Sequence, residues 1–168
     1  STGVLFAEKL RNIHPAGGFL LVVYSIPPIF MGLLTPKIIL PTGKKKTSFI
    51  TGIISAVFLG LIGFSNNIYM ILTYAFFASS FSSITLVLLS AVFEDYVARA
   101  KKASADIVTL GRVTNNLAYI VGPVFFGFIA KEANFSSTFI ISAALILLSA
   151  LLALMLVPRK IKIPQKEI

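Results

Sequence analysis

Residues 107–130 read IVTLGRVTNNLAYIVGPVFFGFIA, an apolar stretch long enough to cross a bilayer as one helix. The stretch also contains large polar side chains and a glycine–proline pair: Arg112, Asn115, Asn116, Tyr119, Gly122 and Pro123. Four of these positions are spaced four, three and four residues apart, so they share one helical face: Arg112, Asn116, Tyr119 and Pro123. Because such polar groups are costly in hydrocarbon, the pattern predicts a membrane helix whose polar face meets protein or a wet cavity.

The composition of the whole chain agrees with a membrane protein. Hydrophobic residues make up 57% of the sequence, charged residues only 12%, and the mean hydropathy is +0.92. A soluble domain is not this apolar. The net charge of +9 is explained by the cytoplasmic excess of Lys and Arg that membrane proteins carry, so no nucleic-acid partner is expected.

Five apolar runs predict an all-α membrane protein with five transmembrane helices in one membrane domain spanning residues 1–168. The expected helices cover residues 17–35, 48–64, 68–93, 107–130 and 136–157. Residues 1–15 are expected to hold the end of an earlier helix and a polar link. Residues 36–47 and 94–106 are expected to form charged loops, and residues 158–168 a basic tail.

The distribution of Lys and Arg between the two sides predicts the orientation. Most of them fall in the 36–47 loop, the 94–106 loop and the tail, whereas the other side has only Lys9, Arg11 and Lys131. The excess places the tail in the cytoplasm and residue 1 outside, in a multi-pass protein of an unspecified membrane.

The five runs also differ in polarity. Residues 48–64 and 136–157 contain little beyond small and aliphatic side chains, so these two helices are expected at the lipid-facing periphery. The other three runs carry tyrosines, prolines, hydroxyls and the Arg/Asn face, so they are expected to line an interior. The odd number of helices and the one-sided interior indicate part of a larger bundle.

Two stretches resemble the major facilitator superfamily of secondary transporters. Residues 32–37 (GLLTPK), followed by Gly43 and three lysines, resemble its cytoplasmic Gly-x-x-x-Asp-Arg-…-Gly-Arg-Arg loop. Residues 118–127 (AYIVGPVFFG) resemble its Gly-Pro-containing helix, as in drug and vesicular-amine proton antiporters. Where the family loop has an acidic residue, this chain has Pro36, and extra residues precede Gly43.

The resemblance covers nearly the whole chain and implies spans eight to twelve of a twelve-span transporter; spans two to six remain an alternative, since the halves are related by internal repeat. It implies a helical bundle in the lipid bilayer, completed by the remaining half, that moves an unknown small molecule by alternating access. No cofactor is implied.

The candidate substrate-binding residues are polar or aromatic and lie in the three interior-type runs: Arg112, Asn115, Asn116, Tyr119, Tyr24 and Tyr74. Each has a structural alternative. In that interpretation Arg112 pairs with Glu94, Asp95 or Asp106, or extends to the membrane interface. The carboxamides then form hydrogen bonds between helices, and the aromatic rings contribute only to packing. The candidate gating or hinge residues are Pro27, Pro28, Gly122 and Pro123, since proline interrupts the helical hydrogen bonds.

Catalysis is not expected. The chain has no cysteine and one histidine, His14, which excludes zinc clusters and histidine-based nucleophilic sites. No carboxylate lies in the centre of a predicted span, so a proton-carrying acid would belong to the other half. The sequence therefore predicts a secondary transporter fragment and not an enzyme; the alternative is a non-transporting membrane subunit whose polar helix face binds a partner protein.

Overall fold

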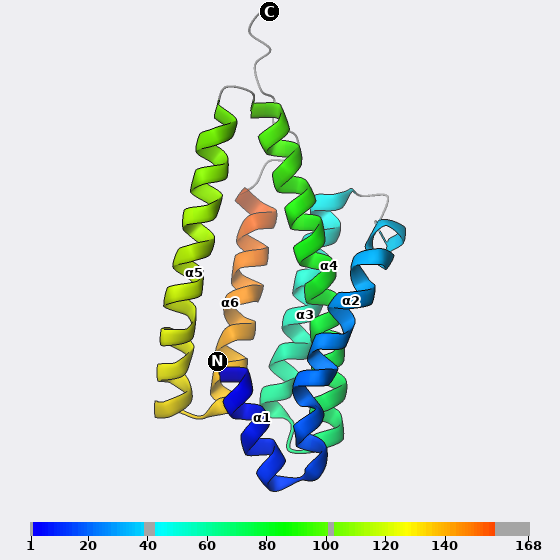
Figure 1. Ribbon diagram of the computed structural model, residues 1–168, viewed down its shortest axis with the longest axis vertical. Coiled ribbons are helices and arrows are strands. Elements are labelled where there is room, and N and C mark those ends of the chain that lie inside the picture. Colours follow the sequence, from blue (N-terminus) through cyan, green and yellow to red (C-terminus); the bar gives the residue numbers. More distant parts are fainter. Residues whose placement is uncertain (1, 39–42, 101–102, 157–168) are drawn as a thin grey trace, which may run out of the picture.

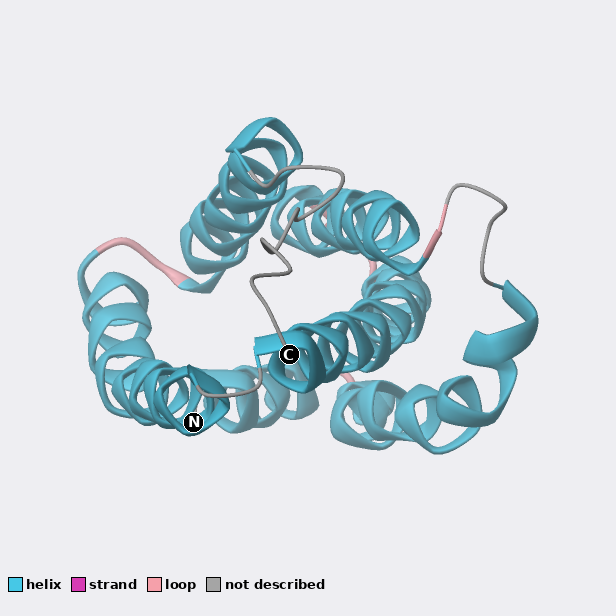
Figure 2. Ribbon diagram, turned by 90° about the horizontal axis from the view of Figure 1, so that it is seen from above, coloured by secondary structure: helices cyan, strands magenta, loops and turns pink. Residues whose placement is uncertain are grey.

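The computed structural model describes residues 2–38, 43–100 and 103–156, and every regular element in these ranges is a helix. Figures 1 and 2 show the helices joined by short connections. In chain order the elements are α1 (Thr2–Ile13), the 3-10 helix η1 (Pro15–Phe19), α2 (Leu20–Ile38), α3 (Lys44–Phe64), α4 (Ile68–Ala100), α5 (Ser104–Glu132) and α6 (Phe135–Leu156). Five helices are long and apolar enough to cross a membrane, which confirms the predicted all-α membrane fold.

Several expected helix boundaries are wrong because charged residues do not end these helices. α4 continues through Glu94 to Ala100, where a loop was expected, and α3 already begins at Lys44. α1 likewise extends through the expected polar link to Ile13. Lys and Arg are good helix formers, so a helix continues into water beyond the apolar run. The expected tail at residues 158–168 lies outside the described residues.

Within the described ranges α3 is the central helix, packed against both α4 and α6. The expected peripheral position of residues 48–64 is therefore wrong for this part of the bundle. Glycines explain the close approach: a Cβ at Gly63 would lie 2.7 Å from the Ser136 carbonyl oxygen of α6, and one at Gly60 would lie 3.4 Å from the Ala143 Cβ. Small residues let membrane helices approach in this way.

Hydroxyl groups join α3 to α4. The Thr51 and Thr85 hydroxyl oxygens are 2.8 Å apart, and the Ser55 hydroxyl donates to the Ala78 carbonyl oxygen at 2.8 Å. The expected interior-lining hydroxyls of α4 are instead buried between helices, with Ser79 only 2% exposed. Ser79 and Thr85 bond to other helices, whereas the Ser80 and Ser83 hydroxyls donate to carbonyl oxygens of α4 itself.

The proline pair in α2 stays inside a continuous helix because a neighbouring helix supplies a missing hydrogen bond. Pro28 has no N–H, so the carbonyl oxygen of Tyr24, four residues earlier, has no donor in its own helix. The Ser79 hydroxyl of α4 donates to that oxygen at 2.5 Å. α2 is thereby attached to α4 at the proline step, where a neighbouring helix satisfies the freed carbonyl group.

α5 lies along one edge of the bundle and contacts α4 and α6 only sparsely (Figure 1). Although it is 29 residues long, none of its described side chains is buried. α4 and α5 are joined at the end of the bundle where α2 finishes and α3 begins, so the expected charged loops do share one end. Lys9, Arg11 and Lys131 belong to elements at the opposite end.

Candidate functional site

A groove of about 790 Å³ lies between the halves of α4 and α5 nearest their connection. Its wall on α4 is formed by Leu86, Leu89, Ser90, Phe93 and Glu94. Its wall on α5 is formed by Ile107, Val108, Leu110, Gly111, Arg112, Thr114, Asn115 and Tyr119. The groove is therefore mainly apolar, with a guanidinium, a carboxamide and a phenol placed along one side.

α4 and α5 approach closely at Gly111, which lines the groove. A Cβ at Gly111 would lie 2.8 Å from the Phe93 ring, so the absence of a side chain there lets the ring pack on the α5 backbone. Beyond this contact the two helices separate, and the positions that follow Gly111 by one, four and eight residues face the groove. These are Arg112, Asn115 and Tyr119, which share a helical side.

Arg112 is the principal charge of the groove. It is exposed, and no carboxylate of the described residues forms an ion pair with it. Asp95, one of its expected partners, instead meets Lys44 at 3.1 Å. Glu94 lines the same groove without forming an ion pair with Arg112 in the described parts of the chain. A guanidinium in this setting can donate up to five hydrogen bonds to an acidic group.

The structure brings together three of the six predicted substrate-binding residues, Arg112, Asn115 and Tyr119, and leaves three outside the groove. Asn116 is exposed on α5 and is not among the residues that line the groove, and Tyr24 lies on α2, 47% exposed. Tyr74 lies between α4 and α3, with its ring 6.3 Å from that of Phe58. The surroundings of Tyr74 therefore agree with the alternative that its ring packs between helices.

The predicted hinge residues have different surroundings. Pro27 is fully buried, whereas Pro28 is exposed, and both lie in the continuous helix α2. A Cβ at Gly122 would meet nothing within 4 Å, and Pro123 is exposed within the continuous helix α5. A hinge function for these four residues stays a prediction.

Sequence reasoning missed the α4 wall of the groove. Leu86, Ser90 and Glu94 follow one another at intervals of four residues, so the sequence predicts that they share one helical face. The expected end of the helix at residue 93 assigned Glu94 to a loop. This boundary error hid Glu94, the one carboxylate among the described residues that line the groove.

No group of three or more His, Cys, Asp or Glu side chains gathers in the described ranges to hold a metal ion. The arrangement instead offers a large apolar groove with a few polar groups, which is typical of small-molecule sites. Its donors are able to orient a ligand, whereas a nucleophile–base pair for catalysis is not found among the groove residues.

Comparisons with known proteins give one match. Residues 4–167 match the family model described as Major Facilitator Superfamily, which covers nearly the entire chain. No curated protein and no solved structure matches this chain.

Proposed function

Because this chain belongs to the Major Facilitator Superfamily, we propose that it forms most of the carboxy-terminal half of a secondary active transporter that moves a small molecule by alternating access. Transport is the function of this superfamily, and the five apolar helices make the chain an integral multi-pass membrane protein. In this proposal α2 to α6 correspond to spans eight to twelve. The alternative of a non-transporting subunit is not favoured by the family match.

The observation that carries the proposal is the groove between α4 and α5. Arg112, Asn115 and Tyr119 lie on a helix with no buried side chain, at the edge of the bundle, where a second half can face them. Polar residues that have no partner within their own chain are what a shared transport site requires. By contrast, the Ser79 and Thr85 hydroxyls of α4 are bonded to α2 and α3 of the same chain.

In the proposed site Arg112 attracts an acidic group of the substrate, Asn115 donates and accepts hydrogen bonds, and Tyr119 supplies a ring and a hydroxyl. Asn116 and Tyr24 are exposed and would contribute from outside the groove once the other half is present. Pro27, Pro28, Gly122 and Pro123 would allow α2 and α5 to bend between the two states.

An antiporter of the drug or vesicular-amine type is the subclass that we propose, on the resemblance of residues 118–127. Coupling to protons normally uses a carboxylate inside the membrane, and the centres of these five helices do not supply one among the described residues. None of the described carboxylates lies at the centre of a candidate span: Glu8 belongs to the short helix α1, and Glu94, Asp95, Asp106 and Glu132 lie toward the ends of α4 and α5. The coupling acid is therefore proposed for the other half.

We also propose that the end of the bundle bearing Lys44 and Arg99 faces the cytoplasm, following the excess of positive charge. The chain contains no cysteine, so single cysteines introduced at Lys46 and at Asn66 report on opposite ends. A membrane-impermeant thiol reagent added to intact cells should label the Asn66→Cys variant and leave the Lys46→Cys variant unlabelled. The reverse labelling would contradict the orientation.

Uptake or efflux by the full-length transporter tests the site. Arg112→Ala should reduce transport by about tenfold or more, because a charged hydrogen bond contributes about 1.5–3 kcal/mol. Arg99→Ala is the matched control, since Arg99 is an exposed arginine at the same end that does not line the groove. Equal transport by both variants and the parent protein would remove Arg112 from the site.

A further inference from the structure

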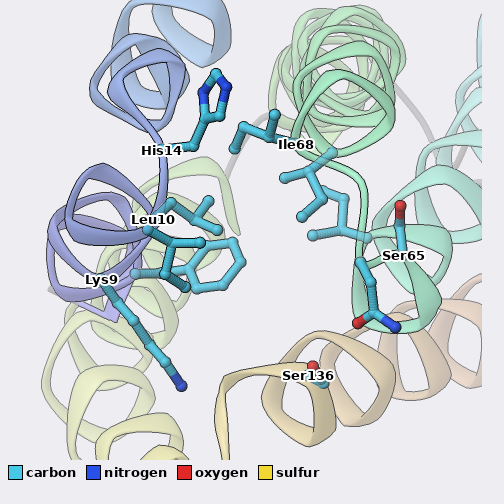
Figure 3. A pocket seen from close by; sticks show the side chains of 11 residues that line it. Lys9, Leu10, His14, Ser65, Ile68 and Ser136 are labelled. Carbon is cyan, nitrogen blue, oxygen red and sulfur yellow. The ribbon is translucent and has the colours of Figure 1, made fainter.

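A second pocket, of about 190 Å³, is seen from close by in Figure 3. The helix ends that form it lie at the end of the bundle opposite the one where α4 finishes and α5 begins (Figure 1). It is formed where α1, the end of α3, the start of α4 and the start of α6 meet, with lining residues Phe6, Lys9, Leu10, Ile13, His14, Ile62, Ser65, Asn66, Ile68, Ile71 and Ser136. None of these residues lines the groove between α4 and α5, so the pocket is separate from the proposed transport site.

The inner part of the pocket is apolar and well packed. Phe6, Leu10, Ile62 and Ile71 are each less than one-tenth exposed and belong to one hydrophobic cluster. The Phe6 ring is held edge-on against the Phe139 ring of α6, with ring centroids 4.8 Å apart. This part of the pocket therefore offers a preformed surface for a hydrocarbon chain.

The polar groups around the apolar part are neutral or cationic, and no carboxylate of the described residues lines the pocket. Lys9 extends from α1 toward the start of α6, where Ser136 lies (Figure 3). Its ammonium is 5.4 Å from the centre of the Phe135 ring, and no ion pair within the described ranges neutralises it. The Lys9 charge is thus held at the pocket by contact with an aromatic ring.

His14 lies on the other side of Leu10 from Lys9 (Figure 3). Its Nδ1 accepts a hydrogen bond from the Ala16 backbone N–H at 3.1 Å. Because Nδ1 is an acceptor there, the ring proton of the neutral imidazole is on Nε2, which leaves a donor available. Asn66 and Ser136 add further donors, whereas the Ser65 hydroxyl donates to the Asn67 carbonyl oxygen at 3.4 Å.

We propose that this pocket binds the anionic head of an amphiphile, a phosphate or carboxylate group carried on an apolar chain. The Lys9 ammonium and the neighbouring donors fit the anion, and the cluster around Phe6 fits the first part of the chain. The starts of α4 and α6 at the pocket add partial positive charge. The volume corresponds to roughly six water molecules at about 30 Å³ each, so it suits a head group and not a whole lipid.

The location of the pocket supports this class of ligand. α3 ends at Phe64, α4 begins at Ile68 and α6 begins at Phe135, so the pocket lies at the level where three spans meet the membrane surface. Lipid head groups occupy that level of a bilayer. The proposal does not depend on the transport site, because a groove that failed to carry substrate would leave this pocket unchanged.

Binding to the purified full-length transporter in neutral detergent tests the proposal, with the shift in thermal unfolding midpoint as the readout. The probes are short-chain phosphatidylglycerol, short-chain phosphatidylcholine, a short-chain fatty acid and inorganic phosphate. Phosphatidylglycerol or the fatty acid should raise the unfolding midpoint with a saturable dependence on concentration. The probe that binds shows whether the pocket takes a phosphate or a carboxylate head group. Phosphatidylcholine and inorganic phosphate should leave the midpoint unchanged.

Lys9→Gln should weaken binding of the anionic amphiphile by about tenfold, and Lys9→Arg should retain it. Lys131→Gln is the matched control, because Lys131 is an exposed lysine at the same end of the bundle that does not line the pocket. Equal weakening in the Lys9→Gln and Lys131→Gln variants, or no weakening in either, would overturn the proposal. Binding of inorganic phosphate as tight as that of phosphatidylglycerol would also overturn it.

Discussion

α4 and α5 are consecutive long helices that both carry polar groups through an apolar bundle, yet their polar groups have opposite surroundings. In α4 the buried serine Ser79 donates to α2, and Thr85 bonds to a hydroxyl of α3. In α5 Arg112, Asn115 and Tyr119 have no such bonds to neighbouring helices among the described residues, and Tyr119 is 81% exposed. Small hydroxyls thus join helices of this chain, whereas the large polar groups face outward from it.

The difference follows from the size of the side chains. A serine or threonine hydroxyl reaches a neighbouring backbone without separating two helices, so close packing and hydrogen bonding are compatible. A guanidinium, carboxamide or phenol needs more space, and none of these groups on α5 is buried by this chain. Under the proposed function, these groups face a wet cavity shared with the other half of the transporter.

Among these predictions, the largest effect on stability is expected at the close contact between α3 and α6. Gly63→Ala should destabilise the protein by about 1–3 kcal/mol, because its Cβ would lie 2.7 Å from the Ser136 backbone oxygen. Gly122→Ala, in α5, is the matched control, since nothing lies within 4 Å of its added Cβ. Unfolding of both variants in detergent would measure the difference, and equal stability would show that α3 and α6 are not packed in this way.

A smaller effect is expected at the bond between α2 and α4. Ser79→Ala leaves the Tyr24 carbonyl oxygen without its donor, which should cost about 1 kcal/mol of unfolding free energy. Ser90→Ala is the control, because Ser90 is an exposed serine of the same helix. In a Pro28→Ala background residue 28 has an N–H that can donate to the Tyr24 carbonyl oxygen, so Ser79→Ala should then have no effect on stability. That result would establish that the Ser79 hydroxyl replaces the donor that Pro28 lacks. Unchanged stability in Ser79→Ala alone would contradict it.

The smallest effect is expected at the Lys44–Asp95 ion pair. Its two side chains are 45% and 47% exposed, and surface pairs of this kind contribute about 0.2–1 kcal/mol. Lys44→Gln should therefore lower the unfolding midpoint only slightly, and the difference from the parent protein should shrink as salt is added. A large loss that is independent of salt would show that the pair has a structural function beyond surface charge.

The sequence predicted the five helices because each is a long apolar run, but it did not predict where they end. Lys44 and Glu94 were assigned to loops although both lie inside helices, because charge was taken as the limit of the helix. The central position of α3 was missed for a different reason. Gly60 and Gly63 decide its packing by contacts with α6 that no local pattern specifies.

The candidate site was predictable in part. The helical spacing of Arg112, Asn115 and Tyr119 places them on one side of α5, and the structure puts all three in the groove. The inclusion of Tyr74 did not follow from spacing, and that ring packs against Phe58. Whether a polar side chain faces a groove or a neighbouring helix depends on long-range packing, which a single sequence does not encode locally.

The bond between the Ser79 hydroxyl and the Tyr24 carbonyl has a mechanical consequence. The Ser79 hydroxyl of α4 donates the hydrogen bond that Pro28 cannot donate within α2. A movement of α2 relative to α4 must therefore first break this hydrogen bond. The two helices are thus expected to travel as one rigid body, with the hydroxyls of Thr51 and Ser55 adding α3 to it. α5, attached by far fewer contacts, is the segment left free to shift against that body.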